Sequence, residues 1–309
     1  MTLACVTGST GFIGRHLCEQ LAAQAIALRT AHSGSQASAL LTDVVKRSES
    51  ELASALEGAD VVYHLAGIAH EGMKGTNQFD LFEVNRDLTL RLYRAALLSG
   101  VKIFVWLSTL KVLGDVAEAP VGLDAPYRPR GTYAQSKAQT EQSLLALPTQ
   151  ATELVIVRPP LVYGPNVKGN FRRLLQLCKT PLPLPFEAAQ GKRSMVGVRN
   201  LVSLLMHLGD KGGDPESRIV HVRDTQEWSV NSLVEELRRL MGQPNRQFRV
   251  SDRSFRALAK VLKREELASR LMDPLRVDAS ESERRLGWQA TRPSVEQLEE
   301  TVTWFQRQR

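Results

Sequence analysis

Apolar and polar residues alternate in blocks along the first half of the chain. Nearly continuous apolar runs cover 3–6, 25–29, 59–65 and 101–107. Between them, apolar residues recur at intervals of three and four over 15–23, 50–56 and 79–98. Buried strands that alternate with amphipathic helices form parallel sheets covered on both faces. The pattern therefore predicts an α/β fold of the Rossmann type, with a doubly wound parallel sheet.

Three glycines follow the first apolar run, in Thr7-Gly8-Ser9-Thr10-Gly11-Phe12-Ile13-Gly14. Their G-x-x-G-x-x-G spacing is one residue longer than the common dinucleotide fingerprint. Glycine lets the backbone turn where a Cβ would clash, and the amides that start the next helix suit a diphosphate. An ordinary glycine-rich turn is the alternative. We expect a dinucleotide cradle, with cofactor contacts from Gly8, Thr10, Gly11, Phe12, Ile13 and Gly14.

The second predicted strand ends at Arg29, and no acid occurs from Leu28 to Ser33. NAD sites place an Asp or Glu near this point, whereas an arginine suits the 2′-phosphate of NADP(H). NADP(H) is therefore favoured. NAD(H) stays open because Arg29 can instead stack on the adenine or point to solvent. Further cofactor contacts are expected from Asp43, at the adenine, and from Leu65, Ala66 and Gly67.

A tyrosine and a lysine four residues apart carry the candidate chemistry. Tyr133 and Lys137 lie at the start of a predicted helix, on one face of it. A free tyrosine, with a pKa of about 10, is a poor acid–base group at neutral pH, and a nearby lysine stabilises its phenolate. The strand over 101–107 runs into Ser108 and Thr109. One of these hydroxyls is expected to hold the substrate oxygen beside the phenol.

Together these motifs resemble the extended short-chain dehydrogenase/reductases that act on nucleotide sugars, within the NAD-dependent epimerase/dehydratase family. The matching segments are the glycine turn, Asp60 before His64-Leu65-Ala66-Gly67, Ser108-Thr109, Tyr133-x-x-x-Lys137, Arg158 to Pro165 and Leu286-Gly287-Trp288. The segment from Arg158 to Pro165 looks like the family's crossover into its substrate lobe. The resemblance implies a dinucleotide-binding domain over 1–160, with strands also contributed by later segments. Residues 161–309 then form mainly a smaller C-terminal substrate-binding lobe.

The resemblance also implies individual roles. Tyr133 is the proton donor or acceptor, Lys137 lowers its pKa and binds the nicotinamide ribose, and Thr109 rather than Ser108 meets the substrate oxygen. His64 is expected to pack near the cofactor rather than to act as a base, since no carboxylate or nucleophile motif accompanies it. The remaining expected contacts are Asn85 and Pro160 to the cofactor and Lys111, Asn170 and Arg193 to the substrate, with Arg193 at its diphosphate.

The residues after Thr109 bear on the reaction. Nucleotide-sugar 4,6-dehydratases have an Asp-Glu pair there, and this chain has Leu110-Lys111. The segments around Ser108, Arg158 and Pro183 look most like bacterial polysaccharide-locus members that reduce a UDP-4-keto-6-deoxy-(N-acetyl)hexose at C4. That reaction, in surface polysaccharide (O-antigen) precursor biosynthesis, is the predicted function. A UDP-hexose 4-epimerase with tightly bound NAD and a non-catalytic dinucleotide-binding protein are the alternatives.

Composition and charge narrow the setting. With 43% hydrophobic and 24% charged residues the chain is globular. Three cysteines in apolar contexts, without metal-ligand spacing, indicate reduced thiols and no metal site. The absence of a signal-like start or a spanning apolar run predicts a cytoplasmic protein. The chain has a net charge of +7, and part of this charge lies in a basic amphipathic segment at 248–271. The basic side chains of this segment are expected to face solvent, and peripheral contact with a membrane is the alternative role. We expect a homodimer, a UDP-sugar substrate and no nucleic-acid partner.

Overall fold

The computed structural model describes residues 2–31, 47–68, 81–147, 151–214, 217–251 and 272–308, together with 253, 254, 257 and 260. Asp43 and most of the basic segment 248–271 lie outside the described residues.

Six parallel strands form the central sheet, in the order β2-β1-β3-β4-β5-β8. They are β1 (Leu3–Thr7), β2 (Ala27–Ala31), β3 (Val61–His64), β4 (Ile103–Leu107), β5 (Glu153–Arg158) and β8 (Ile219–His221). The chain steps outward from β1 to β2 and then returns to β3 on the other side of β1. Ligands of open α/β sheets bind at such a reversal, outside the carboxyl ends of the strands. The predicted doubly wound parallel sheet is confirmed.

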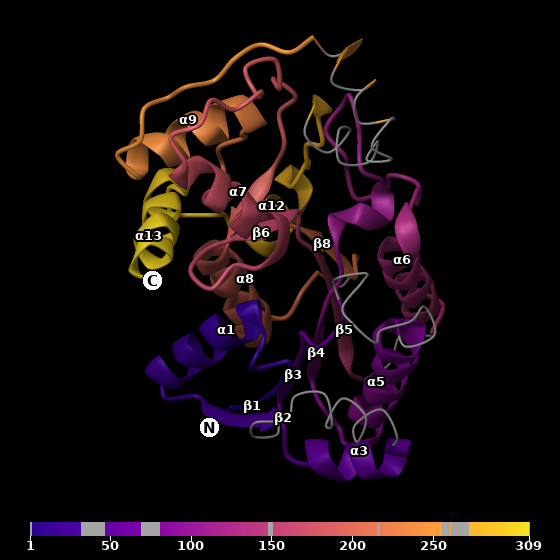
Figure 1. The fold of residues 1–309 in the computed structure, drawn as a ribbon. Helices are drawn as coiled ribbons and strands as arrows, with labels where there is room; N and C mark the ends of the chain where they lie inside the picture. The colour runs from indigo at the N-terminus through magenta and orange to yellow at the C-terminus, as the bar shows by residue number, and fades with distance from the viewer. Residues whose placement is uncertain are drawn as a thin grey trace.

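Helices cover both faces of the sheet (Figure 1). One face packs on α1 (Phe12–Ala23) and α8 (Val198–Lys211), and the other on α3 (Glu49–Leu56), α5 (Leu88–Leu98) and α6 (Gly131–Leu145). Alternate residues of one strand serve the two layers: in β4, Val105 faces α8, whereas Phe104 and Trp106 face α5 and α6. This double burial explains the continuous apolar runs of the strands.

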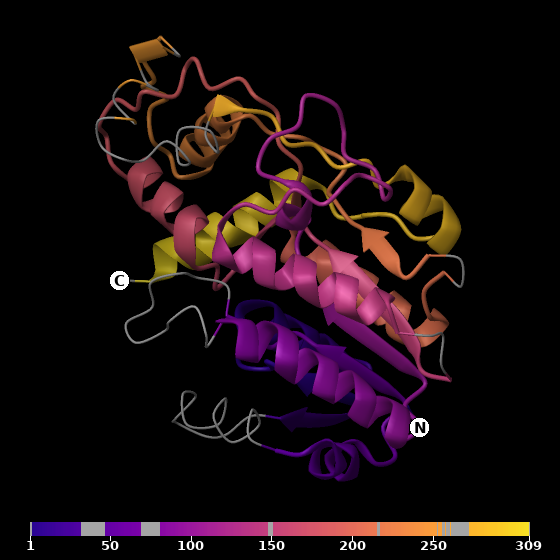
Figure 2. The ribbon, with the colours of Figure 1, turned by 90° about the vertical axis from the view of Figure 1, so that its right-hand side faces the viewer.

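The remaining elements gather at the carboxyl ends of the strands, above the sheet in Figure 2. They are the paired strands β6 (Leu161–Tyr163) and β7 (Met195–Gly197), α7 (Gly169–Lys179), α9 (Val230–Leu240), α12 (Ser280–Leu286) and α13 (Ser294–Arg307). The buried Asp224 carboxylate ties this lobe to α8, because it accepts from the Tyr163 hydroxyl (2.6 Å) and the Asn200 side-chain amide (2.7 Å). The lobe is thus anchored to α8, at the carboxyl ends of the strands.

Several boundaries differ from the sequence prediction, and two of the differences bear on the site. The helix expected over 79–98 contains a π-helical turn, η1 (Glu83–Asp87), between the α-helical residues 81–82 and α5. The Thr89 hydroxyl donates to the Asn85 carbonyl oxygen at 2.9 Å. The Thr140 hydroxyl lies 3.1 Å from the same oxygen and 2.7 Å from the Ser136 carbonyl oxygen. Strand β2 begins and ends two residues later than predicted, at Ala27 and Ala31, because its register with β1 rather than its own apolar run fixes its ends.

Candidate active site

The glycine turn after β1 has no room for side chains on its inner surface. Gly8 has a φ of +72°, and a Cβ there would lie 2.7 Å from the Ala66 backbone nitrogen. A Cβ on Gly14 would overlap the Gly8 carbonyl oxygen. Gly11 is the N-cap of α1 and brings no capping side chain, so the first amides of α1 can serve an anion. These features fit the diphosphate of a dinucleotide.

His64 links the end of β1 to α5. Its Nδ1 lies 2.6 Å from the Thr7 hydroxyl and its Nε2 lies 2.9 Å from the Thr89 hydroxyl. Burial, followed by the nearby charge of Lys137, lowers the pKa of His64 to about 3. The imidazole is therefore neutral at working pH, and both ring nitrogens are occupied. His64 is therefore a packed link between β1 and α5 and not a free base.

Gly67, Asn85 and Lys137 meet at the end of β3. The Asn85 side chain exchanges two hydrogen bonds with the Ile68 backbone and donates to the Ser136 hydroxyl at 3.1 Å. A Cβ on Gly67 would lie 3.0 Å from Asn85 Oδ1 and 3.5 Å from Lys137 Nζ. The absence of a side chain at Gly67 therefore keeps open the space between the cofactor turn and the candidate catalytic helix.

Tyr133 and Thr109 face each other across the end of β4. Tyr133 lies in the first turn of α6, and Thr109 immediately precedes the short helix η2 (Leu110–Leu113). Burial raises the pKa of Tyr133 to about 12, and a hydrogen bond with the Thr109 side chain acts in the opposite direction. Thr109 also accepts from the backbone N–H of Lys111 at 3.3 Å. The structure brings together the two hydroxyls that the sequence assigns to the substrate oxygen.

Lys137 lies one turn after Tyr133, and its side chain is almost fully buried. Its ammonium group donates to the Leu107 carbonyl oxygen at 2.8 Å. Burial lowers the pKa of Lys137 to about 7, and the charge of Glu141 opposes that decrease. An ammonium kept at this position favours the phenolate form of Tyr133 by electrostatic attraction.

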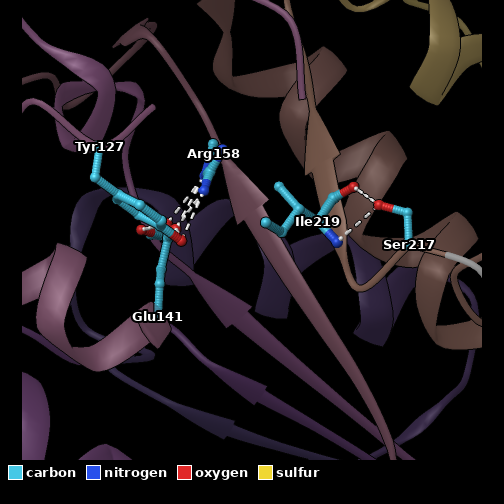
Figure 3. Close-up of polar contacts among 6 residues, drawn as sticks. Tyr127, Glu141, Arg158, Ser217 and Ile219 are labelled. Atoms are coloured by element: carbon cyan, nitrogen blue, oxygen red, sulfur yellow. Dashed lines mark hydrogen bonds and ion pairs between the residues drawn. The ribbon is translucent and has the colours of Figure 1, made fainter. Parts of the chain in front are cut away.

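Ser108 has a different environment from Thr109. Its hydroxyl donates to Glu141, whose carboxylate also accepts from Tyr127 (2.8 Å) and from Arg158 Nε and Nη2 (3.0 and 2.6 Å) (Figure 3). Arg158 lies over the Tyr127 ring, at 5.2 Å from the centroid. Ser108 thus supports a buried charged cluster, a finding that favours Thr109 as the hydroxyl for the substrate. The catalytic assignment of both residues stays a prediction.

Arg29 does not lie at the end of β2. It pairs with Cys5 in mid-strand, two residues before Ala31, and its Nη1 donates to the carbonyl oxygens of Ala55 and Glu57, both at 2.9 Å. The guanidinium therefore binds the carboxyl end of α3, where a cation complements the helix dipole. The strand-end position predicted for Arg29 was wrong, so this arginine no longer supports the preference for NADP(H).

The predicted substrate contacts lie around the lobe side of the site. Lys111 is half-buried in η2, and Asn170 is exposed in the first turn of α7. Arg193 donates to the backbone carbonyls of Asp273 (2.7 Å) and Asp115 (3.2 Å), so it connects a segment of the lobe to the segment that follows η2. Pro160 follows Pro159, whose carbonyl accepts from the Leu110 amide at 2.9 Å. These roles stay predictions.

Three residues of the site escaped the sequence prediction: Trp106, Glu141 and Arg158. Glu141 continues the face of Tyr133 and Lys137 by one more turn, which was the available signal. In the sequence, Arg158 stands only within a motif and Trp106 only within an apolar strand. In the described residues, no helix is long and apolar enough to cross a membrane, and no cluster of three or more acidic, histidine or cysteine side chains could bind a metal ion.

The sequence matches one protein family and several known relatives. Residues 4–220 match the NAD dependent epimerase/dehydratase family. A UDP-glucose 4-epimerase from Vibrio cholerae is 31% identical over 97% of this chain and 94% of its own length. An Escherichia coli O157:H7 N-acetyl-α-D-glucosaminyl-diphospho-ditrans,octacis-undecaprenol 4-epimerase is 26% identical over 74% of this chain and 70% of its own.

Solved structures share the fold. MoeE5, in complex with UDP-glucose and NAD, superposes with a TM-score of 0.75 at 23% identity and covers 98% of both chains. A UDP-glucose 4-epimerase from Thermotoga maritima, with UDP-glucose, superposes with a TM-score of 0.76 at 18% identity and covers 99% of both chains. The family resemblance and the fold expected from the sequence are both confirmed.

Proposed function

Because the chain belongs to the NAD-dependent epimerase/dehydratase family, we propose that this enzyme transfers hydride at C4 of a UDP-hexose, with Tyr133 as its acid–base group. The observation that carries the proposal is the grouping of Tyr133, Thr109 and Lys137 beside Gly67, at the carboxyl end of the sheet. This is where a nicotinamide and a sugar hydroxyl would meet if the glycine turn holds the diphosphate.

Tyr133, Thr109 and Lys137 have different roles in the proposed reaction. When bound, the dinucleotide supplies the hydride chemistry at its nicotinamide ring. Tyr133 removes the proton of the sugar hydroxyl during oxidation and returns it during reduction. Thr109 orients the same oxygen, and Lys137 stabilises the phenolate form of Tyr133. Thr109 is followed by Leu110 and Lys111, so the acid–base pair that eliminates water in 4,6-dehydratases is absent from that position.

Two reactions use these residues, UDP-hexose 4-epimerisation and the reduction of a UDP-4-keto sugar. We propose epimerisation as the first candidate. It uses one acid–base residue and returns the cofactor to its starting form, so it needs no selection for NADP(H). The binding of Arg29 to α3 and the similarity to the Vibrio cholerae epimerase support this choice. NAD(H) is the cofactor that we propose with it.

NADP(H)-dependent reduction of a UDP-4-keto-6-deoxy-(N-acetyl)hexose, in O-antigen precursor biosynthesis, is the second candidate. The absence of an acid from β2 favours it, because an acid at the end of this strand is the usual NAD determinant. We also propose that the enzyme is a cytoplasmic homodimer. Light scattering of the purified protein tests the dimer.

The deciding experiment offers the purified enzyme two sets of substrates. One set is UDP-glucose, UDP-galactose and their N-acetyl forms, with products separated by chromatography. The other is UDP-4-keto-6-deoxy-GlcNAc with NADPH or NADH, followed at the nicotinamide absorbance. Interconversion of the first set without net change in cofactor supports the epimerase, whereas stoichiometric cofactor oxidation supports the reductase. Tyr133→Phe should abolish either activity, and activity retained in that variant rejects the mechanism.

A further inference from the structure

Lys137 has an aromatic partner in the sheet. Its Nζ lies 4.5 Å from the centroid of the Trp106 ring, while the same ammonium donates to the carbonyl of Leu107. Both partners come from the last two residues of β4. We propose that Trp106 is a positioning residue, whose ring face holds the Lys137 ammonium charged and directed at the catalytic site. This proposal rests on the proposed function, in which Lys137 supports Tyr133.

The need for such a partner follows from burial. Lys137 is 4% exposed, and an ammonium removed from water loses hydration that its protein surroundings must replace. One carbonyl oxygen satisfies one of three N–H groups. The face of an indole is the aromatic surface that attracts cations most strongly. Trp106 is fully buried, and its Nε1 has no hydrogen-bond partner in the described part of the chain. Its contribution to the site is therefore the ring face and not the N–H group.

The other ionisable groups around Lys137 do not replace Trp106. Glu141, one turn further along α6, raises the pKa of Lys137, but its carboxylate is already paired with Arg158 of β5. His64 on β3 is neutral, and Tyr133 is protonated in the cofactor-free enzyme near neutral pH. On η1, Asn85 is uncharged, and Arg86 and Asp87 pair with each other at 2.7 Å.

Removing the Trp106 ring should change the pKa values of Lys137 and Tyr133 in opposite directions. The charged form of Lys137 becomes less favourable, so Lys137 loses its proton at a lower pH. Tyr133 then loses part of the attraction that favours its phenolate, so it ionises at a higher pH. The oxidative half-reaction requires the phenolate and the ammonium together, which gives a bell-shaped pH profile. When the bound oxidised cofactor lowers the pKa of Tyr133 below that of Lys137, loss of Trp106 moves the two limbs of that bell toward each other.

The first test measures pH profiles of turnover for Trp106→Leu and Trp106→Phe. Trp106→Leu should narrow the bell by about one pH unit, a change equivalent to ~1.4 kcal/mol. Trp106→Phe keeps an aromatic face and should recover part of the width. Phe104→Leu is the matched control, because Phe104 lies two residues earlier on the same face of β4 and is equally buried. It should lower stability and leave both limbs in place. Equal narrowing in Trp106→Leu and Phe104→Leu would overturn the proposal.

The second test uses the cofactor-free enzyme and needs no substrate. The fluorescence of Trp106 is obtained by subtracting the emission of Trp106→Phe from that of the unmodified enzyme. The variant retains the other three tryptophans, so their emission cancels. This signal should titrate near pH 7, where burial places the pKa of Lys137, and the titration should vanish in Lys137→Met. A signal that does not change between pH 5 and 9 rejects the contact. A titrating signal in an enzyme that turns over none of the UDP-sugars would reject the proposed function and retain the Trp106–Lys137 contact.

Discussion

The guanidinium of Arg158 holds the carboxylate of Glu141 through Nε at 3.0 Å and Nη2 at 2.6 Å, and both side chains are buried. The pair connects β5 to α6 one turn after Lys137. Ser108 and Tyr127 donate to the same carboxylate. The cluster thereby fixes the helix that carries Tyr133 against the strand end that carries Thr109.

Glu141→Gln should destabilise the protein strongly, because it leaves the Arg158 charge buried without a counter-charge. Breaking a buried pair on one side costs about 3–5 kcal/mol. Glu236→Gln is the control, since the Glu236–Arg239 pair lies at the surface and such pairs contribute about 0–1 kcal/mol. Urea unfolding of both variants measures the difference. Similar small losses in the two variants would show that the buried pair is not a determinant of stability.

Thr109→Val and Ser108→Ala should separate catalysis from stability. The hydrogen bond to Thr109 lowers the pKa of Tyr133, so its removal moves the acid limb of turnover to higher pH. We expect kcat at neutral pH to fall by about tenfold or more. Ser108→Ala removes one donor from Glu141 and should cost about 1–3 kcal/mol of stability, with a kcat change of less than about threefold. Steady-state kinetics and urea unfolding of both variants test the assignment, and the reverse pattern would assign the substrate oxygen to Ser108.

Gly14→Ala should weaken dinucleotide binding by more than about tenfold, because the added methyl group overlaps the Gly8 carbonyl and displaces the turn. Gly58→Ala provides a matched comparison. Gly58 has a positive φ of +76°, and no atom lies within 4 Å of a Cβ added there. The Gly58→Ala variant should lose about 1 kcal/mol of stability and keep its affinity for the dinucleotide. Calorimetric titration with NAD decides, and unchanged affinity in Gly14→Ala would contradict the predicted cradle.

Arg29→Ala should leave the preference between NAD and NADP unchanged. The expected effect is a loss of about 1 kcal/mol of stability, since two hydrogen bonds to the end of α3 disappear. Affinities for both dinucleotides and a thermal melt measure the two effects. A selective loss of NADP binding would restore the predicted role of Arg29 at the 2′-phosphate.

Stability should fall as the pH drops below about 6.5. Burial lowers the pKa of His64 to about 3, and burial with the nearby charge of Arg158 lowers that of His221 to about 4. The unfolded chain therefore takes up protons near pH 6.5 that the folded protein excludes until much lower pH. Each histidine contributes a slope of up to about 1.4 kcal/mol per pH unit in that window. Urea midpoints between pH 8 and 5 measure the slope, which should be shallower in His64→Gln.

Local sequence predicted most of the fold and several candidate site residues. The alternation of apolar runs with helical spacing depends on neighbours a few residues apart, so it identified the strands and helices and the parallel sheet. The glycine spacing, the four-residue separation of Tyr133 and Lys137 and the hydroxyls after β4 are also local signals. The structure places all three at one end of the sheet, because the carboxyl ends of its parallel strands point the same way.

The tertiary structure decided what depends on distant residues. The end of β2, and with it the position of Arg29, follows from pairing with β1. Ser108 and Thr109 are adjacent and alike in sequence, but only the fold brings Glu141, 33 residues away, to one of them. The same is true of Lys137 and Trp106, which meet because α6 packs on β4. Sequence alone thus determined which groups the chain brings to its site. Packing of α6 against the sheet determined which hydroxyl supports the structure and which faces the phenol, since burial and pKa depend on neighbours in space.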